Sequence, residues 1–397
     1  MDFPLPRRCP FDPPAEYRTA TEERPLTQVT LPTGGTAWLA TRYADVRMLL
    51  AHPDISSDAR HPNFPALGVG EREAAAAHRP FIRMDPPDHT SVRRMLQGTF
   101  TVKRAQEMRP AIQQIVDEAV TDLLASTPPV DLVAVYANRV ATETICHLLG
   151  IVTPDDLAFF RKITAVTGAR ASTAEQIGEA LGQLFALLNR VVDDKISDPG
   201  EDLISRLATG PLAEGRITRT DLLSQLGITL NAGHETTRSM ISLSVLALLH
   251  HPGQLDLLRA DPALLPGAVD ELLRYLSVAD TIPLRVALAD IPVGSQVIRA
   301  GEAVIASLGS ANRDPAAFNE PDTLDIRRAD NRHLALGHGV HQCIGGHLGR
   351  MELELALSAL IERVPALRLA GDIGDLPLRQ ANSIFGVESM PVGWGPR

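Results

Sequence analysis

The stretch from residue 333 to residue 350 concentrates side chains that can do chemistry. It reads HLALGHGVHQCIGGHLGR and contains five glycines, four histidines and one cysteine, Cys343. A cysteine in this setting can be a small buried residue, one ligand of a zinc site, a nucleophile beside His341, or the axial ligand of a haem. The histidine spacing, H-x4-H-x2-H-x-C-x3-H, matches no closed tetrahedral zinc site.

Glycine gives the backbone around this cysteine unusual freedom. It lets the chain pass close to a flat ligand and bend sharply around the sulfur, and four glycines stand nearby: Gly337, Gly339, Gly345 and Gly346. Backbone N–H groups in such a loop can donate to a thiolate, and a helix from Ile344 to about Arg363 would point its positive end at the sulfur. We therefore favour axial ligation of a haem, with the other roles open.

Two further motifs place charges at helical spacing. In ELLR, Glu271 and Arg274 are three residues apart, so their side chains can pair on one face of a helix. In RMDPPDHTSVRR, residues 83–94, a Pro-Pro turn leads into a helix that carries one histidine and two arginines. Taken singly, each motif is ordinary, because most such side chains are solvated surface charges.

A long helix would carry the fourth motif, AGHETT. We expect this helix to begin at the capping residue Thr218, three residues before Asp221, and to end before Pro252. About 30 residues at about 1.5 Å each would span about 45 Å. The centre, NAGHETTRS, contains Glu235 and Thr236 and is a poor helical sequence, because glycine and paired threonines weaken a helix and can kink it. Such a weak centre suggests a functional role.

The rest of the chain predicts a mainly α fold with small peripheral β-sheets. Alternating runs at about 26–41, separated by PTGG, predict a β-hairpin, and short strand-like runs return after Leu276. Between them, helical periodicity dominates a body at about 88–277. The Pro-, Gly- and His-rich stretch 52–70 is long enough to be a functional loop. Strands and helices do not alternate regularly along the chain, so the sequence does not predict a parallel sheet of the α/β type.

Composition excludes several classes of protein. The 397 residues carry a net charge of −10, and 44% of them are hydrophobic, which is typical of a globular protein with a substantial core. An acidic chain without a basic tail disfavours nucleic acid as a partner, and no apolar run reaches the roughly 18 residues of a membrane span. We therefore expect a cytoplasmic protein. No glycine motif for nucleotide or nicotinamide binding is present, so any electrons must come from another protein.

Together and in this order, the four motifs resemble those of the cytochrome P-450 haem-thiolate monooxygenases. GHGVHQCIGGHLGR resembles the haem-binding loop, ELLR the E-x-x-R pair, AGHETT the oxygen-activation motif and DPPDHTSVRR the early helix. The likeness covers essentially the whole chain and is closest to bacterial members of natural-product pathways. It implies one haem-thiolate domain at 1–397 with a long central helix and a cysteine haem loop at 336–346. One departure is Leu336, where the family usually has phenylalanine.

The resemblance implies roles for individual residues around a haem b. Cys343 would be the axial ligand of the iron. Three loop residues would surround it: Leu336, Gly337 and Gly345. Four residues would bind the two propionates: His89, Arg93, Arg285 and His341. Glu271 and Arg274 would form a structural ion pair, completed by Arg327 or Arg328.

On the other side of the haem, the resemblance assigns the chemistry to the long helix. Thr236 and Glu235 would hold water and deliver protons during oxygen activation, and Ala232 and Gly233 would leave room for O2. The substrate would lie against the loop 60–70 and against six further residues: Ile228, Asn231, Thr281, Ile282, Ile384 and Phe385. Most of these are apolar, as expected for a site that binds by burial.

The implied reaction inserts one oxygen atom from O2 into a C–H or C=C bond of an apolar small molecule, such as a polyketide or macrolide secondary metabolite. Two electrons would come from a ferredoxin and its reductase, with docking on the cysteine side at Arg94, Arg104 and Arg350. We expect a monomer. Two alternatives remain: a peroxygenase, which would need no oxygen-linked proton relay, and a non-enzymatic zinc- or haem-binding protein, which would need no buried ion pair.

Overall fold

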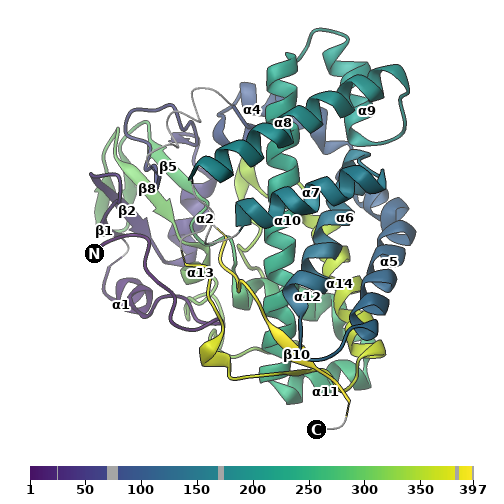
Figure 1. Ribbon diagram of the computed structural model, residues 1–397. Coiled ribbons are helices and arrows are strands. Elements are labelled where there is room, and N and C mark those ends of the chain that lie inside the picture. The colour runs from purple at the N-terminus through teal and green to yellow at the C-terminus, as the bar shows by residue number, and fades with distance from the viewer. Residues whose placement is uncertain (25, 69–78, 169–173, 381–383, 396–397) are drawn as a thin grey trace.

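The computed structural model describes residues 1–24, 26–68, 79–168, 174–380 and 384–395. Helices dominate this part of the chain, and the strands form three small sheets at its margins (Figure 1). The expected fold class, mainly α with small peripheral β-sheets, is therefore confirmed.

The largest sheet joins the N-terminal hairpin to strands from much later in the chain. Its order is β1 (Leu26–Thr30), β2 (Thr36–Ala40), β8 (Ala303–Ala306), β5 (Leu284–Ala287) and β3 (Ile55–Ser56). β1 and β2 are antiparallel, with Leu26 opposite Ala40, whereas β2 and β8 are parallel. Arg285 lies on β5 and is therefore held by strands on both sides.

Two smaller sheets involve short strands. β10 (Pro391–Gly393) lies between β4 (Val130–Asp131) and β9 (Arg368–Leu369), and it is antiparallel to both. β6 (Ile291–Val293) and β7 (Gln296–Ile298) form a separate antiparallel hairpin. The first of these sheets fixes the C-terminal segment to the helical body.

The helices are distributed along the whole chain. Before the long helix come α1 (Ala15–Glu23), α2 (Tyr43–Ala51), α4 (Asp88–Gln97), α5 (Val102–Ala125), α6 (Asn138–Leu149), α7 (Pro154–Gly168), α8 (Ala174–Ser197) and α9 (Leu203–Leu207). After it come α11 (Pro252–Ala260), α12 (Leu265–Leu276), α13 (Leu308–Ala311) and α14 (Gly346–Arg363). Short 3-10 turns at Phe81–Arg83 and Gly339–His341 lie in the two loops that carry site residues.

The long helix α10 (Arg219–His250) runs through the middle of the molecule (Figure 1). As expected, it begins after the cap Thr218, whose side chain accepts a hydrogen bond from the Asp221 N–H. The helix continues without a break through its weak centre. There the Thr236 hydroxyl donates to the Ala232 carbonyl at 2.6 Å. This side-chain hydrogen bond exists beside the backbone hydrogen bonds of the helix, and the helix is not interrupted.

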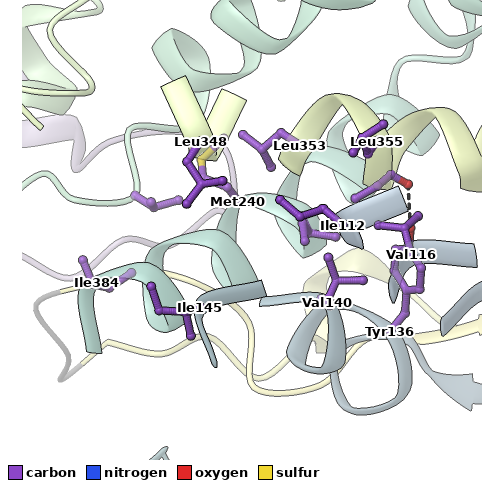
Figure 2. Close-up of a cluster of buried hydrophobic side chains, with 14 of the residues drawn as sticks. Ile112, Val116, Tyr136, Val140, Ile145, Met240, Leu348, Leu353, Leu355 and Ile384 are labelled. Carbon is purple, nitrogen blue, oxygen red and sulfur yellow. Dashed lines mark hydrogen bonds between the residues drawn. The ribbon is translucent and has the colours of Figure 1, made fainter. Parts of the chain in front are cut away.

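The hydrophobic core lies where α5, α6, α10 and α14 pack together. Figure 2 shows Ile112 and Val116 of α5 beside Val140 of α6 and Leu355 of α14. Tyr136 is fully buried among them, and its hydroxyl donates to the Ala356 carbonyl at 2.7 Å. Each buried aliphatic side chain of this kind contributes roughly 1.5–3 kcal/mol relative to exposure. This core holds α10 and α14, the two helices that carry most of the site.

Helix α14 begins at Gly346, two residues later than the expected Ile344. The difference has a local cause, because Ile344 and Gly345 form a turn and Gly345, with φ of −84° and ψ of 9°, is the residue that precedes the helix. Among the helices of the described residues, none is both long enough and apolar enough to cross a membrane.

Candidate functional site

Two glycines shape the loop that presents Cys343. Gly337 and Gly339 both have φ of +72°, a backbone conformation that favours glycine. A Cβ atom on Gly339 would also lie 2.5 Å from the carbonyl oxygen of Leu50, so the loop passes too close to α2 for any side chain. The loop is therefore fixed by backbone geometry as well as by the Cys343–Leu336 hydrogen bond.

Cys343 lies in the wall of a cavity of about 290 Å³ that α10, α14 and the cysteine loop enclose together with the 3-10 turn at Phe81–Arg83. Most of the wall is apolar. Representative lining residues come from four segments: Ile82, Ile145, Ile228, Met240, Val278 and Ile282. A cavity of this composition binds a ligand mainly by removing apolar surface from water.

Cationic and imidazole groups gather at one edge of the cavity. The rings of His89 and His341 lie 4.2 Å apart between centroids, and Arg93 donates from Nη2 to the Gln342 carbonyl at 2.7 Å. Burial, with Arg83 nearby, lowers the pKa of Arg285 to about 9. The family resemblance assigned four residues to the haem propionates, and the structure places all four at this edge: His89, Arg93, Arg285 and His341.

The same edge carries polar atoms that lack protein partners. Both ring nitrogens of His89 and Nδ1 of His341 are buried without a hydrogen-bond partner among the described residues. Arg285 donates to the Leu284 carbonyl and pairs with no carboxylate of the described chain. Burial and the neighbouring cations lower the pKa of His341 to about 2. Buried donors need a hydrogen-bond partner, and the cations Arg93 and Arg285 beside them favour an anionic one, so the edge fits the two propionates of a haem.

Arg83 is a site residue that the sequence analysis missed. It lines the cavity, its guanidinium carbon lies 5.0 Å above the centre of the Phe64 ring, and its charge acts on Arg285 and His341. The only sequence feature that could have indicated a role for Arg83 is its position two residues before the Asp-Pro-Pro turn. That signal was weak, since a lone arginine before a turn is ordinarily solvated.

The Cys343 thiol experiences opposing influences. Burial raises its pKa, while the Gly345 N–H and the charges of Arg93 and Arg350 act in the other direction without reversing the shift. The expectation that the following helix favours the thiolate is therefore only partly met. The donors are present, but burial is the larger effect on the thiol itself.

Glu271 and Arg274 form a fully buried ion pair on α12. Two hydrogen bonds of 2.8 Å join them, from Nε and Nη2 of Arg274 to the two carboxylate oxygens. Of the two candidates for a third member, Arg328 contacts Glu271, at 3.0 Å, and Arg327 is exposed. Arg274 also donates to the carbonyls of Asn312 and Pro321. The cluster therefore ties α12 to the segment that precedes the cysteine loop.

The described residues contain no group of three or more His, Cys, Asp or Glu side chains that could hold a metal ion. The histidines around Cys343 are directed to different neighbours. For example, His333 contacts Asp270 at 3.2 Å, whereas His341 contacts His89. A zinc site built from these histidines is thus not formed.

Comparison with known proteins identifies the family. A sequence model described as cytochrome P450 (written P-450 below) matches residues 258–365. The chain is 44% identical over 393 residues to cytochrome P-450 105A3 of Streptomyces carbophilus, covering 99% of this chain and 95% of that one.

The chain belongs to the cytochrome P-450 family.

Two other family members show what this architecture does elsewhere. The 20-oxo-5-O-mycaminosyltylactone 23-monooxygenase of Streptomyces fradiae is 41% identical, covering 99% of this chain and 92% of that one. The crystal structure of the mycinamicin VIII C21 methyl hydroxylase from Micromonospora griseorubida, bound to mycinamicin VIII, has a TM-score of 0.91 and 39% identity, covering 99% and 100% of the two chains.

This protein is therefore a P-450 monooxygenase, as the motifs implied. Family membership brings a haem-thiolate cofactor, separate redox partners and a small-molecule substrate. The unpartnered imidazoles, the buried Arg285 and the glycine-bounded loop beside Cys343 all fit a flat, dianionic macrocycle.

Glu235 precedes Thr236 on α10 but has different surroundings. This residue is not among the described residues that line the cavity, and it lies in a buried charged cluster with His234, Arg238 and Arg379. Burial opposes ionisation, but His234 and Arg379 outweigh it and lower the pKa of Glu235 to about 2. The expected role of Glu235 in proton delivery stays a prediction.

The other three residues assigned to oxygen activation do line the cavity: Ala232, Gly233 and Thr236. Packing also favours glycine at position 233, because a Cβ atom there would lie 2.5 Å from Cδ1 of Ile145. A side chain at this position would therefore have to displace the Ile145 side chain where α6 approaches α10.

Of the six expected substrate residues, Ile228 and Ile282 line the cavity. Four are absent from the described lining: Asn231, Thr281, Ile384 and Phe385. Asn231 is exposed on another face of α10, because the lining residues of this helix recur every four positions, at 228–229, 232–233 and 236–237, and position 231 lies outside that stripe. The expected loop 60–70 lies partly outside the described residues.

Three other residues that are absent from the described lining make contacts elsewhere. Ile384 and Phe385 are buried in packing contacts, and the Phe385 ring lies 4.3 Å below the guanidinium of Arg7. Thr281 sits in a turn in which the Ile282 N–H approaches the Ala279 carbonyl at 3.4 Å. Within that turn Ala279 and Ile282 face the cavity and Thr281 does not.

Two of the three arginines expected to meet an electron donor are already paired. Arg104 contacts Glu107 at 2.8 Å, and Arg350 contacts Asp270 at 2.7 Å. Arg94 is exposed and forms no ion pair with a described residue.

Proposed function

We propose that Cys343 is the axial ligand of a haem b in the cavity and that its propionates are bound at the edge formed by four residues: His89, Arg93, Arg285 and His341. The observation that carries this proposal is the set of buried imidazole nitrogens that have no partner among the described residues, next to a buried arginine that forms no ion pair with a described carboxylate. When bound, the haem supplies the redox chemistry by which one atom of O2 enters the substrate and the other leaves as water.

The protein contributes positioning and control of water. The Thr236 donor is used on the Ala232 carbonyl, which leaves the hydroxyl oxygen free to accept a hydrogen bond from a water molecule in the cavity. Thr236 thereby orients a proton-carrying water. The apolar lining excludes other water, which strengthens every electrostatic interaction inside.

The substrate class that we propose is a macrolide or related polyketide secondary metabolite, hydroxylated or epoxidised at an apolar position. Support comes from two relatives whose names specify a mycaminosyltylactone and mycinamicin VIII. The apolar lining, with Ile228, Met240 and Ile282, is consistent with a largely hydrocarbon ligand.

The electron source that we propose is a ferredoxin with its reductase, which docks near Cys343. The exposed Arg94 supports this, because an unpaired cation can meet an acidic partner. We further propose that residues 1–397 act as one catalytic domain, as a monomer in the cytoplasm.

A spectrum tests the cofactor proposal. The purified protein is reduced, carbon monoxide is added, and the absorption spectrum is recorded for the wild type and for Cys343→His. We expect a strongly red-shifted Soret band that the substitution abolishes. A wild-type band at the position of histidine-ligated haem would contradict thiolate ligation.

Turnover tests the reaction. The holoenzyme is supplied with ferredoxin, ferredoxin reductase and a panel of macrolide lactones, and products are analysed by mass spectrometry with labelled O2. We expect one labelled oxygen in the product. Binding of only non-polyketide compounds, seen as a spin-state change of the haem, would overturn the substrate class and leave the cofactor assignment intact.

A further inference from the structure

Arg7, in the segment before α1, is a buried arginine that none of the roles above uses. It is 5% exposed and forms no ion pair with a carboxylate of the described chain. Its guanidinium is used on the backbone at the end of α12: Nη1 donates to the Leu276 carbonyl at 3.0 Å and Nη2 to the Ser277 carbonyl at 3.1 Å. An arginine that binds two successive carbonyls fixes the path of the chain that carries them.

The backbone at Ser277 needs such support. Its φ of +42° and ψ of +59° are left-handed, a strained conformation for a residue with a side chain. Besides Arg7, two contacts hold it: the Asn312 side chain donates to the Ser277 hydroxyl at 2.8 Å, and this hydroxyl donates to the Arg274 carbonyl at 2.9 Å. Strain of this kind persists only where the surroundings impose it, and it is common at ligand sites.

The residues that follow Ser277 form one wall of the cavity. Four of them line it: Val278, Ala279, Ile282 and Pro283. If the Ser277 backbone relaxed to an ordinary φ, the chain would leave α12 in another direction, and these side chains would move with it. The left-handed conformation of Ser277 therefore sets where this wall stands.

Arg7 also holds a segment from the other end of the chain against the same wall. Its guanidinium lies 4.3 Å from the centre of the Phe385 ring, and the Phe385 N–H donates to the Val278 carbonyl at 2.8 Å. The backbone of Arg7 is fixed in turn, because its N–H donates to Oε1 of Gln380 at 3.0 Å and its carbonyl accepts from Nε2. One side chain thus joins three segments that meet behind the cavity.

Asp280 fixes the opposite side of the turn without help from Arg7. Its Oδ1 accepts from the Ser307 hydroxyl and from the Gly309 N–H, both at 2.7 Å. The two charged groups are close, since a Cβ atom on Gly309 would lie 3.1 Å from Cγ of Asp280 and 3.4 Å from Nη2 of Arg7. Asp280 keeps both donors when Arg7 is replaced, so a substitution at Arg7 acts mainly on the end of α12 and on Phe385.

We propose that Arg7 is a positioning residue that sets the size selectivity of the cavity. Its hydrogen bonds keep Ser277 in the left-handed turn, and the turn places Val278 and Ala279 in the wall. Arg7 acts only through this wall, because it is absent from the described lining. The inference rests on the proposal that the haem and the substrate share this cavity, and it is independent of the chemical class of the substrate.

Hydrogen exchange tests the positioning without turnover. Amide exchange of the purified holoenzyme is followed by mass spectrometry in peptides that span residues 277–283 and 384–390. We expect about tenfold faster exchange in Arg7→Met, the effect of two lost hydrogen bonds. Arg8→Met is the matched control, because Arg8 is the exposed neighbour, and it should exchange like the wild type. Unchanged exchange in Arg7→Met would overturn the proposal. If that variant fails to fold, Arg7→Lys takes its place, because it keeps the charge and loses the fork of donors.

Size selectivity is tested with imidazole and 4-phenylimidazole, whose ring nitrogens are ligands of haem iron and whose dissociation constants are read from the Soret band. A misfit of about one methylene group changes binding about 10–200-fold, so we expect the ratio of the two constants to change about tenfold or more in Arg7→Met, less in Arg7→Lys and not in Arg8→Met. A loss of folded protein alone would lower the amount of holoenzyme and leave this ratio unchanged.

The two experiments separate this inference from the proposed function. An unchanged ratio in holoenzyme of Arg7→Met would overturn the selectivity role. A wild type whose Soret band does not respond to imidazole would contradict the haem assignment, and the exchange rates would then decide on Arg7 by themselves.

Discussion

Arg379 holds the carboxyl of Glu235 through a hydrogen bond of 2.6 Å from Nη1 to Oε2, which ties the centre of α10 to the segment before β10. The acid next to Thr236 is thus part of a buried charged cluster and not of the cavity wall. Its strong electrostatic coupling makes it a contributor to stability, and the contribution depends on pH.

Glu235→Gln should destabilise the holoenzyme at neutral pH. The pKa falls from the ordinary 4.5 to about 2, which corresponds to about 3 kcal/mol. Because the folded-state pKa is depressed, this stabilisation is present above about pH 4.5 and is lost as pH falls towards about 2. Urea unfolding of both proteins over this range measures it. A stability difference that stays constant as pH falls would show that the charge of Glu235 is not responsible.

Arg328→Met should destabilise the protein, whereas Arg327→Met should not. Arg328 shares the buried Glu271 with Arg274, and removing one partner of a buried ionic cluster typically costs about 3–5 kcal/mol. Arg327 is exposed, so its replacement should change stability by less than about 0.5 kcal/mol. Thermal unfolding of the two neighbouring variants gives a direct comparison, and equal melting temperatures would contradict the assignment.

Gly339→Ala should abolish haem retention. The substitution combines a positive φ with a Cβ atom 2.5 Å from the Leu50 carbonyl, so the cysteine loop must move. Gly182→Ala is the control, because Gly182 is exposed on α8, is absent from the described cavity lining and has open space around it, and alanine favours a helix by about 1 kcal/mol. The haem content of the purified variants is the measurement. Full haem content in Gly339→Ala would show that the loop tolerates the shift.

Thr236→Ala should retain haem and lose coupling of electron use to product. Without the hydroxyl, cavity water loses the acceptor that orients it, and we expect about tenfold less product per electron, with hydrogen peroxide formed instead. Thr236→Ser keeps the hydroxyl and should remain coupled. Reductant consumption, peroxide and product are measured together. Normal coupling in the alanine variant would remove Thr236 from the mechanism.

Arg94→Glu should slow turnover with ferredoxin and leave peroxide-driven turnover unchanged. Arg94 is exposed, so reversing its charge acts on the docking partner and not on an internal pair. Arg350→Glu is a less direct test than the sequence suggested, because it would also place two acids together at Asp270. Equal losses in both assays for Arg94→Glu would argue against docking at this surface.

Local features of the fold were predictable from the sequence, because their causes are close in the chain. The cap Thr218 acts on Asp221, three residues away, and Glu271 and Arg274 share one helix face by spacing alone. The motif order was also sufficient to predict the family and the edge where His89 meets His341.

Features that depend on distant packing were not predictable. Glu235 and Arg379 are 144 positions apart, so nothing near AGHETT indicates an ion pair. Glu352 is buried and lines the cavity, whereas Glu354, two residues along the same helix, is half-buried and absent from the described lining, and nothing in the local sequence distinguishes the two. Thr281 gives another example. Its neighbours Ala279 and Ile282 line the cavity and Thr281 does not, because tertiary contacts and not the local sequence pattern set the orientation of this turn.

The parallel pairing of β2 with β8 has a consequence for synthesis of the chain. Thr36–Ala40 leaves the ribosome long before Ala303–Ala306. The edge of β2 that pairs with β8 therefore has no partner strand while most of the polypeptide is made. Arg285 acquires its neighbouring strands only when β8 arrives, and Cys343 follows later still. Cofactor capture therefore comes at the end of folding, and a truncated chain should remain without haem.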